Sequence, residues 1–341
     1  MGKYKLINNV LGWIVFAIAS TVYLMTMEPT ASFWDCGEFI SSAYKLEVGH
    51  PPGAPFFMLT ANLFTQLASD PSTVAKMVNT MSALFSGLTI LFLFWSITHL
   101  ARKIMVKDGE EASLGQMITV MGSGLVGALA YTFSDTFWFS AVEGEVYAYS
   151  SLFTAVVFWL ILKWEAVADK PHADRWIVLI AYLMGLSIGV HLLNLLCIPA
   201  IVLVYYYKKF PNPTMKGTLV ALLASFAIVA LMMYGVVQGL VEVCGYFELL
   251  FVNVLGMPYN SGVFAYVIIV AGVLIWSIWE TMRDEIHPTR MKIAFILSVV
   301  LIGIPFIGSG YVLAVILTAA LSLYLFKSKK VDIKTLNTIL V

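Results

Sequence analysis

The sequence is poor in cysteine and in charged residues. Its three cysteines, at positions 36, 197 and 244 of 341, are far apart and show no CxxC or Cys/His spacing, so neither a disulfide framework nor a zinc site is indicated. Charged residues make up 12% of the chain, whereas ordinary soluble domains contain about a quarter. The net charge is zero and there is no long basic run, so we expect no nucleic-acid partner.

Apolar residues are abundant instead, at 60% of the chain with a mean hydropathy of +0.88. Apolar stretches near the length of about 20 residues that crosses a bilayer recur along the sequence. They predict an all-α polytopic membrane protein, with about ten spans in a single domain over residues 1–341 or in the N-terminal part of a longer protein. The expected spans are roughly 8–27, 77–100, 115–133, 146–164, 176–190, 193–207, 217–239, 263–280, 292–307 and 309–326.

The basic residues are distributed unevenly between the two sides of these spans. All of them except Lys45 and Lys76 fall in alternate connecting segments or at the ends of the chain. Under the positive-inside rule this places both termini in the cytoplasm and the first loop, residues 28–76, on the opposite face, which is rich in acidic residues. Residues 54–67 are apolar but too few to span, so we expect an interfacial or re-entrant helix there.

This long first loop contains two acidic residues three positions apart, Asp35 and Glu38. Residues 36–46 have helical periodicity, with Ser32 as the expected cap, and three residues along a helix bring two carboxylates to one face. One carboxylate can accept a proton while the other positions a group or a metal, and proximity separates their pKa values. The alternative is that both acids simply occupy the first turn of a helix, where the macrodipole favours them.

The same loop continues with Gly49, His50, Pro51, Pro52 and Gly53. Two prolines fix the backbone and the flanking glycines permit a sharp turn, so this segment predicts a rigid corner that presents a histidine. Taken alone, a Pro-Pro pair at the edge of an amphipathic segment is more often a helix boundary.

Together, the acidic pair after the first span, the His-Pro-Pro segment and the following apolar helix resemble the first luminal loop of the GT-C glycosyltransferases, especially the protein O-mannosyltransferases. The segments 34–39 and 49–53 are still more similar to those of a large bacterial membrane family. The animal relative of that family is an O-mannosyltransferase acting on plexin-type receptor domains. The resemblance is specific over about residues 28–56 and 138–150, and it implies a GT-C-like fold.

The resemblance implies transfer of a sugar, such as mannose, from a polyprenyl-phosphate donor to a hydroxyl outside the cytoplasm, with inversion. It also implies that Asp35 is the catalytic base and that Glu38 orients a substrate or binds a divalent cation. In the mannosyltransferases the two acids are adjacent, whereas here two residues separate them, so which carboxylate is the base stays open. The implied partners are the lipid-linked donor, membrane lipids, and a secreted or periplasmic acceptor protein or glycan at a bacterial inner membrane.

Further candidate substrate-binding residues lie in the other external segments. Glu143, Glu145 and Tyr147 come at the expected start of the fourth span, where the similar family has its second motif, although aromatic residues there also form interface belts. His191 and Asn194 lie at a tight turn and either line the cavity or satisfy each other. Glu242, Glu248 and Asn253 lie in an external loop expected over residues 239–262, which is a candidate cover for an acceptor groove. The only external groups that can meet a phosphate are Lys45, Lys76, His50 and His191.

Two other classes of function compete with the enzyme. A transporter or flippase also suits ten helices broken by glycine and proline. Coupled carriers usually keep ionisable residues near mid-span, however, and here the acidic residues gather on one external face. A noncatalytic scaffold is the third alternative, and it would be insensitive to replacement of Asp35.

Overall fold

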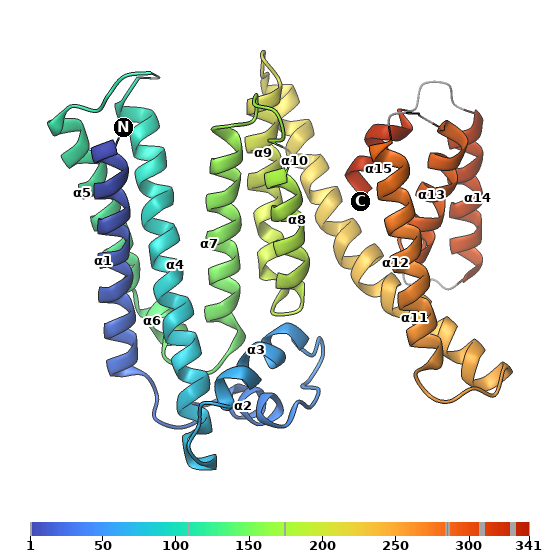
Figure 1. Cartoon of the computed structure of the whole chain (residues 1–341), viewed down its shortest axis with the longest axis horizontal. Helices are drawn as coiled ribbons and strands as arrows, with labels where there is room; N and C mark the ends of the chain where they lie inside the picture. Colours follow the sequence, from blue (N-terminus) through green and yellow to red (C-terminus); the bar gives the residue numbers. More distant parts are fainter. Residues whose placement is uncertain are drawn as a thin grey trace. The chain divides into compact units, whose positions relative to one another are not determined.

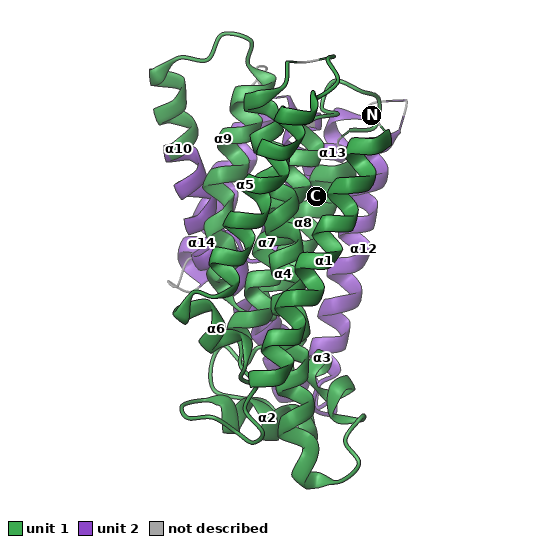
Figure 2. Cartoon of the chain, turned by 90° about the vertical axis from the view of Figure 1, so that its left-hand side faces the viewer, with its two compact units in different colours: residues 1–222 green, residues 223–341 purple. Residues whose placement is uncertain are grey.

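A computed structural model describes residues 2–107, 109–173, 175–283, 285, 287–306, 311–327 and 332–340, and within these ranges every regular element is a helix. The chain divides into two compact units, residues 1–222 and 223–341 (Figure 2). The all-α class predicted from the apolar stretches is therefore confirmed.

The first unit is a bundle of long helices with short helices gathered at one end (Figure 1). α1, α4, α5 and α7 run along the bundle, while α2, α3 and α6 lie at the end opposite the N-terminus. The long helices are α1 (Gly2–Thr26), α4 (Val74–Met105), α5 (Leu114–Thr132), α7 (Val146–Glu165), α8 (Arg175–Ile188), α9 (Ile198–Lys209) and α10 (Met215–Ala230). The short ones are α2 (Cys36–Lys45), α3 (Pro55–Thr65), η1 (Pro71–Thr73), α6 (Asp135–Ala141) and η2 (Leu192–Cys197).

The second unit is also helical in its described residues. Tyr266 of α12 donates a hydrogen bond to the Leu301 carbonyl at the end of α13, at 2.6 Å. The elements are η3 (Leu231–Val237), α11 (Gln238–Leu249), η4 (Leu250–Val254), α12 (Ser261–Met282), α13 (Pro288–Leu301), α14 (Tyr311–Lys327) and α15 (Ile333–Leu340).

Seven helices of the described chain are long and apolar enough to cross a membrane, so the chain is an integral membrane protein. Most of each of the ten expected spans is helical in its described residues, although residues 189–190 and 302–306 lie beyond the ends of α8 and α13. The expected spans at 176–190, 292–307 and 309–326 correspond to α8, α13 and α14, which have 14, 14 and 17 residues and are not among these seven helices. Ten crossings therefore stay a prediction, as does the sidedness.

The expected loop over residues 239–262 was wrong, because its first two thirds are helical. α10, η3, α11 and η4 continue one another from Met215 to Val254. Glu248, which was predicted to cover an acceptor groove, instead accepts hydrogen bonds from the backbone N–H groups of Asn260 and Val263, at 2.6 and 3.1 Å. Its carboxylate satisfies the free donors at the start of α12, which is a structural role.

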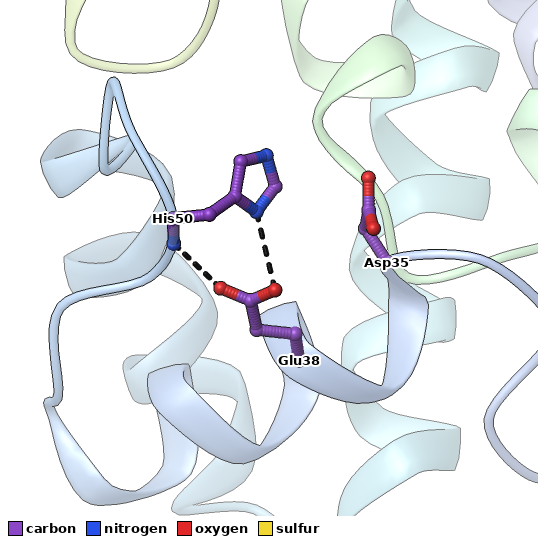
Figure 3. Close-up of side chains that lie close together, drawn as sticks. All are labelled: Asp35, Glu38 and His50. Carbon is purple, nitrogen blue, oxygen red and sulfur yellow. Dashed lines mark hydrogen bonds and ion pairs between the residues drawn. The ribbon is translucent and has the colours of Figure 1, made fainter.

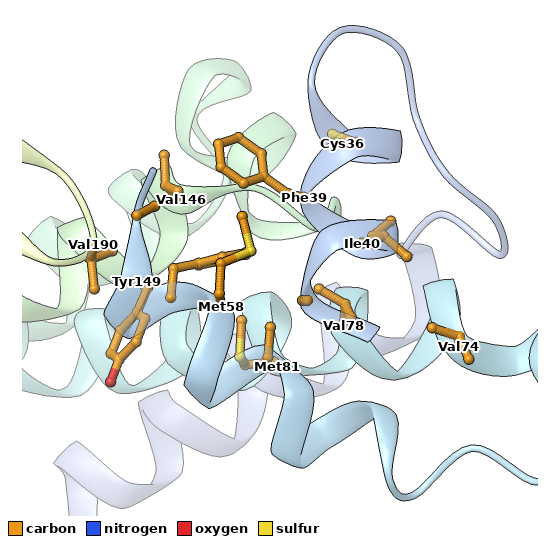
Figure 4. Packing of buried hydrophobic residues seen from close by; sticks show 14 of the residues in the cluster. Cys36, Phe39, Ile40, Met58, Val74, Val78, Met81, Val146, Tyr149 and Val190 are labelled. Atoms are coloured by element: carbon orange, nitrogen blue, oxygen red, sulfur yellow. The ribbon is translucent and has the colours of Figure 1, made fainter. Parts of the chain in front are cut away.

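The first loop is docked tightly onto the end of the first unit. α2 and α3 share a buried apolar cluster with α4 and α7, in which Phe39 and Met58 meet Met81 and Tyr149 (Figure 4). The N–H groups of Phe56 and Phe57 donate to the Gly189 carbonyl, at 2.7 and 3.2 Å. The short helix expected within residues 54–67 is α3, and its 11 residues pack against the bundle end rather than spanning.

Candidate functional site

Asp35 lies at the start of α2, at the N-cap position, but its side chain caps nothing. The Asp35 carboxylate therefore does not have the structural role of capping the helix. The prediction that Ser32 caps this helix was wrong: the Ser32 side chain hydrogen-bonds with Glu143 instead. The helix macrodipole still favours a negative charge at this position, but no hydrogen bond to the helix terminus occupies the Asp35 carboxylate.

Glu38 is linked to His50 by two hydrogen bonds (Figure 3). The His50 backbone N–H donates to Oε1 at 2.5 Å, and His50 Nδ1 lies 3.1 Å from Oε2. Both bonds stabilise the charged carboxylate, so they lower the pKa of Glu38. A Cβ at Gly49 would lie 3.2 Å from Oε1, so the glycine before His50 allows this close approach. Glu38 therefore positions the histidine.

Asp35 lines two adjoining cavities at this end of the first unit. The smaller, of about 80 Å³, also contacts His50, Pro52, Glu145 and His191. The larger, of about 280 Å³, is lined by Trp34, Asp35, Phe139, Ser140, Glu143, Glu145 and Tyr147. Asp35, Glu145 and Tyr147 line both. Segments that are more than a hundred residues apart in the sequence therefore line the same two cavities.

Glu143 and Glu145 are buried beside these cavities, with 4% and 9% of their surfaces exposed. Burial raises the pKa of Glu143, although hydrogen bonds from Ser32 and Cys36 oppose the change. Burial, helped by repulsion from Glu143 and Asp35, raises the pKa of Glu145 to about 7. The carboxyl group of Glu145 can therefore hold a proton near neutral pH, whereas the Glu38 carboxylate stays charged.

We expect the stability of the protein to fall as pH rises from about 4.5 to about 7. The unfolded chain loses the Glu145 proton near the ordinary value of 4.5, whereas the folded protein keeps it until about 7. In this window the folded state binds more protons, so each rise in pH favours unfolding, by up to about 3 kcal/mol in total. Glu145→Gln, which mimics the protonated acid, should flatten this dependence and raise Tm at pH 8.

The measurement is a thermal melt of purified protein in detergent between pH 5 and pH 8. Glu47→Gln, which removes an exposed carboxylate of the same loop, is the control and should melt like the wild type at each pH. An equally steep pH dependence in Glu145→Gln and the wild type would show that Glu145 is already charged in the folded protein.

Only some of the other predicted substrate-binding residues line the two cavities. Pro52, Tyr147 and His191 line the cavities, together with His50. Pro51 and Lys45 line neither cavity. Asn194 is fully buried away from them, because its Nδ2 donates to Ser187 at 2.8 Å and its Oδ1 accepts from Thr154 at 3.3 Å.

Asp35, Glu38 and His50 have one ligand atom each that lie within 4.8 Å of one another. Two carboxylate oxygens and an imidazole nitrogen can hold a divalent cation, with water completing the coordination. None of the residues described as lining the two cavities is Lys or Arg, and His50 and His191 are the basic groups there. A cation held by this group would supply the positive charge that those residues lack.

Several contributors to the site were not predicted from the sequence, among them Trp34, Phe39 and Ser140. Trp34 lines the larger cavity and is 89% exposed, with a backbone φ of 63° that is unusual for a bulky residue. Phe39 forms part of the smaller cavity, and Ser140 part of the larger. A strained residue directly before a candidate acid is the kind of feature found at functional sites, but φ angles are invisible in a sequence.

A third cavity, of about 600 Å³, runs along the membrane-spanning helices and shares the lining residue Tyr147 with the other two. Its walls come from α4, α5, α7 and η2 and are mainly apolar, and they include small residues such as Gly127, Ser151 and Ala155. A groove of this kind accommodates an alkyl or prenyl chain, whose polar end would then lie beside Tyr147, Asp35 and Glu145.

Residues 35–214 match the family model described as the N-terminal domain of the protein O-mannosyl-transferase TMEM260. The chain belongs to this family. The matched residues contain the acidic pair, the histidine corner, the glutamate pair and the groove, so the family match covers the candidate site apart from Trp34. The resemblance to O-mannosyltransferases seen in the first loop is thereby confirmed.

Two curated members of the family show the extent of the similarity. The mouse protein O-mannosyl-transferase TMEM260 is 28% identical over 174 residues, which is 51% of this chain and 22% of the mouse protein. The Dictyostelium discoideum protein O-mannosyl-transferase tmem260 is 25% identical over 187 residues, 53% of this chain and 21% of that protein. The match thus spans about a fifth of the length of these relatives. No solved structure matches the chain.

Proposed function

We propose that the chain is the membrane-embedded catalytic part of a glycosyltransferase that moves a sugar from a polyprenyl-phosphate donor to a protein hydroxyl. The relatives' names support mannose as the sugar and protein as the acceptor. The observation that carries the proposal is the position of Tyr147, which lines the apolar groove and both cavities around Asp35. A lipid-linked donor needs a place for its chain next to a place for its reacting end, and Tyr147 borders both.

In the proposed reaction the prenyl chain lies in the groove and the sugar-phosphate reaches the cavities. The acceptor oxygen forms a bond to the anomeric carbon while the bond from that carbon to the phosphate oxygen breaks, and the electron pair leaves with the phosphate. Asp35 takes the hydroxyl proton as the new bond forms, which is general-base catalysis. Attack opposite to the leaving phosphate inverts the anomeric carbon.

The surrounding residues have distinct roles in this proposal. Glu38 holds His50 at the edge of the smaller cavity, where His50 and His191 can donate N–H groups to the phosphate. A divalent cation, if used, would be held by Asp35, Glu38 and His50 and would stabilise charge on the phosphate. Glu145, protonated near neutral pH, can donate a hydrogen bond to the sugar without adding a third negative charge.

The distribution of basic residues under the positive-inside rule supports a proposal for the sidedness of the reaction. We propose that the cavities face the non-cytoplasmic side, that both termini are cytoplasmic, and that the host membrane is a bacterial inner membrane with the site facing the periplasm. The secreted or periplasmic acceptor can then reach Asp35 without crossing the bilayer.

The proposal is tested by incubating the purified protein in detergent with synthetic polyprenyl-phosphate mannose and Ser/Thr-containing proteins secreted by the same organism. We expect intact-mass spectrometry to show acceptors that gain one hexose. A parallel reaction with polyprenyl-phosphate glucose tests which sugar is transferred. A parallel reaction with a mannan acceptor tests whether the acceptor is a protein or a glycan. Movement of the donor across vesicles with no glycosylated product would instead favour a flippase.

A further inference from the structure

A second cavity of about 600 Å³ lies at the opposite end of the first unit from the candidate site. Lys5 near the start of α1, Arg102 in the last turn of α4 and Lys163 in the last turn of α7 line it. The candidate site lies at the other ends of these helices, beside α2 and α3 (Figure 1). The two places are therefore separated by the length of a membrane span.

The three cations of this cavity are not neutralised. In the described chain none of them forms an ion pair, and no Asp or Glu is among the residues described as lining the cavity. Lys5 and Lys163 are close enough to repel each other. By contrast, the neighbouring Lys103 pairs with Glu165 at 2.6 Å. A cavity that is lined by several cationic side chains and by no carboxylate attracts an anion.

Aromatic rings hold two of these cations in place. The Arg102 guanidinium lies 4.7 Å from the centre of the Tyr4 ring, and Lys163 Nζ lies 4.8 Å from that of Trp159. Such cation–π contacts orient the side chains without cancelling their charge. The cations are therefore arranged before any ligand arrives.

The same cavity contains polar groups with unmet hydrogen-bonding capacity. Among the described residues, Asn8 Oδ1, Trp95 Nε1 and His99 Nε2 are buried and have no hydrogen-bond partner, and all three residues line the cavity. Buried polar atoms are normally paired, and each exception requires an explanation. These atoms make the wall of the cavity polar, which suits a phosphate ester with hydroxyl groups better than an apolar ligand.

We propose that this cavity binds the headgroup of an anionic glycerophospholipid. The cavity lies at helix ends where basic and tryptophan side chains meet, which is the level of lipid phosphates, and basic pockets between spans bind anionic headgroups. Trp13, which lines the cavity and is 52% exposed, offers an apolar surface to the acyl chains. A zwitterionic lipid fits less well, because its ammonium group would face cations and no carboxylate. This site does not depend on the proposed sugar transfer.

The test is native mass spectrometry of the delipidated protein in detergent, titrated with phosphatidylglycerol or with phosphatidylcholine of the same acyl chains. We expect one phosphatidylglycerol to bind to the wild type and phosphatidylcholine to bind far more weakly. The double variant Lys5→Gln/Lys163→Gln should weaken phosphatidylglycerol binding roughly thirtyfold. This factor corresponds to the loss of two basic groups that each contribute about 1 kcal/mol near a lipid surface. Arg102→Gln tests the same site with one charge, should the double variant not fold, and is expected to lose about fivefold.

Lys170→Gln/Lys216→Gln is the matched control, because it removes two exposed lysines that do not line the cavity, and it should bind like the wild type. Glycerol phosphate, which has the headgroup but no acyl chains, distinguishes a lipid site from a site for a soluble phosphate ester. Equal loss in the control, equal binding of phosphatidylcholine, or full competition by glycerol phosphate at equimolar concentration would each overturn the lipid site.

Discussion

Asp35→Asn is expected to reduce sugar transfer by at least about a hundredfold while the protein remains folded, because a general base contributes about 10²–10⁴ to rate. The asparagine has the same shape but cannot take a proton from the acceptor hydroxyl. The Asp35 side chain makes no cap hydrogen bond, so its replacement leaves α2 intact. The measurement is initial-rate transfer from polyprenyl-phosphate mannose, with Tm measured on the same samples.

Two variants decide how specific this loss is. Glu47→Gln changes an exposed acid of the same loop and should transfer at the wild-type rate. Glu38→Gln keeps an oxygen that can accept the His50 N–H but loses charge, so we expect a smaller decrease of about tenfold, typical of a weakened charge-assisted hydrogen bond. A larger loss in Glu38→Gln than in Asp35→Asn would make Glu38 the base. Normal transfer by both variants would remove the acidic pair from the mechanism.

The helices could be predicted from the sequence because the bilayer imposes a simple rule on composition. A span must be apolar over its length and must satisfy its backbone internally, and most of each expected stretch is helical where the structure describes it. The rule fails beyond the span ends. Residues 239–254 contain Glu242 and Glu248, which suggested a loop, but a helix that leaves the membrane can carry acids and still continue.

The candidate site could be predicted only in its local part. The spacing of Asp35 and Glu38 and the His50 corner are short-range features, and the structure brings them together. The contact between this loop and Glu145 depends on packing between α2, α3, α4 and α7, which no periodicity reveals. For the same reason Asn194 was predicted as a cavity residue, although its amide is used inside the bundle.

Filling the apolar groove should reduce use of the long-chain donor more than tenfold while sparing the chemistry. Ala155 lines the groove on α7, roughly 12 Å along the helix from Tyr147. In Ala155→Trp the indole occupies space that the prenyl chain would fill. Because each buried CH₂ contributes about 0.8 kcal/mol, loss of even two or three should lower kcat/KM for polyprenyl-phosphate mannose more than tenfold.

A short-chain donor separates this effect from damage to the site. Mannose linked to citronellyl phosphate has too little chain to reach Ala155, so the wild type and Ala155→Trp should use it equally. Ala130→Trp places the same bulk on an exposed position of α5 outside the groove and should leave both donors unaffected. If Ala155→Trp used the long donor as well as the wild type does, the donor chain would lie elsewhere, and Tyr147 would lose its role as the link between lipid and carboxylates. If both donors failed only in Ala155→Trp, the indole would have disturbed the cavities around Asp35 instead.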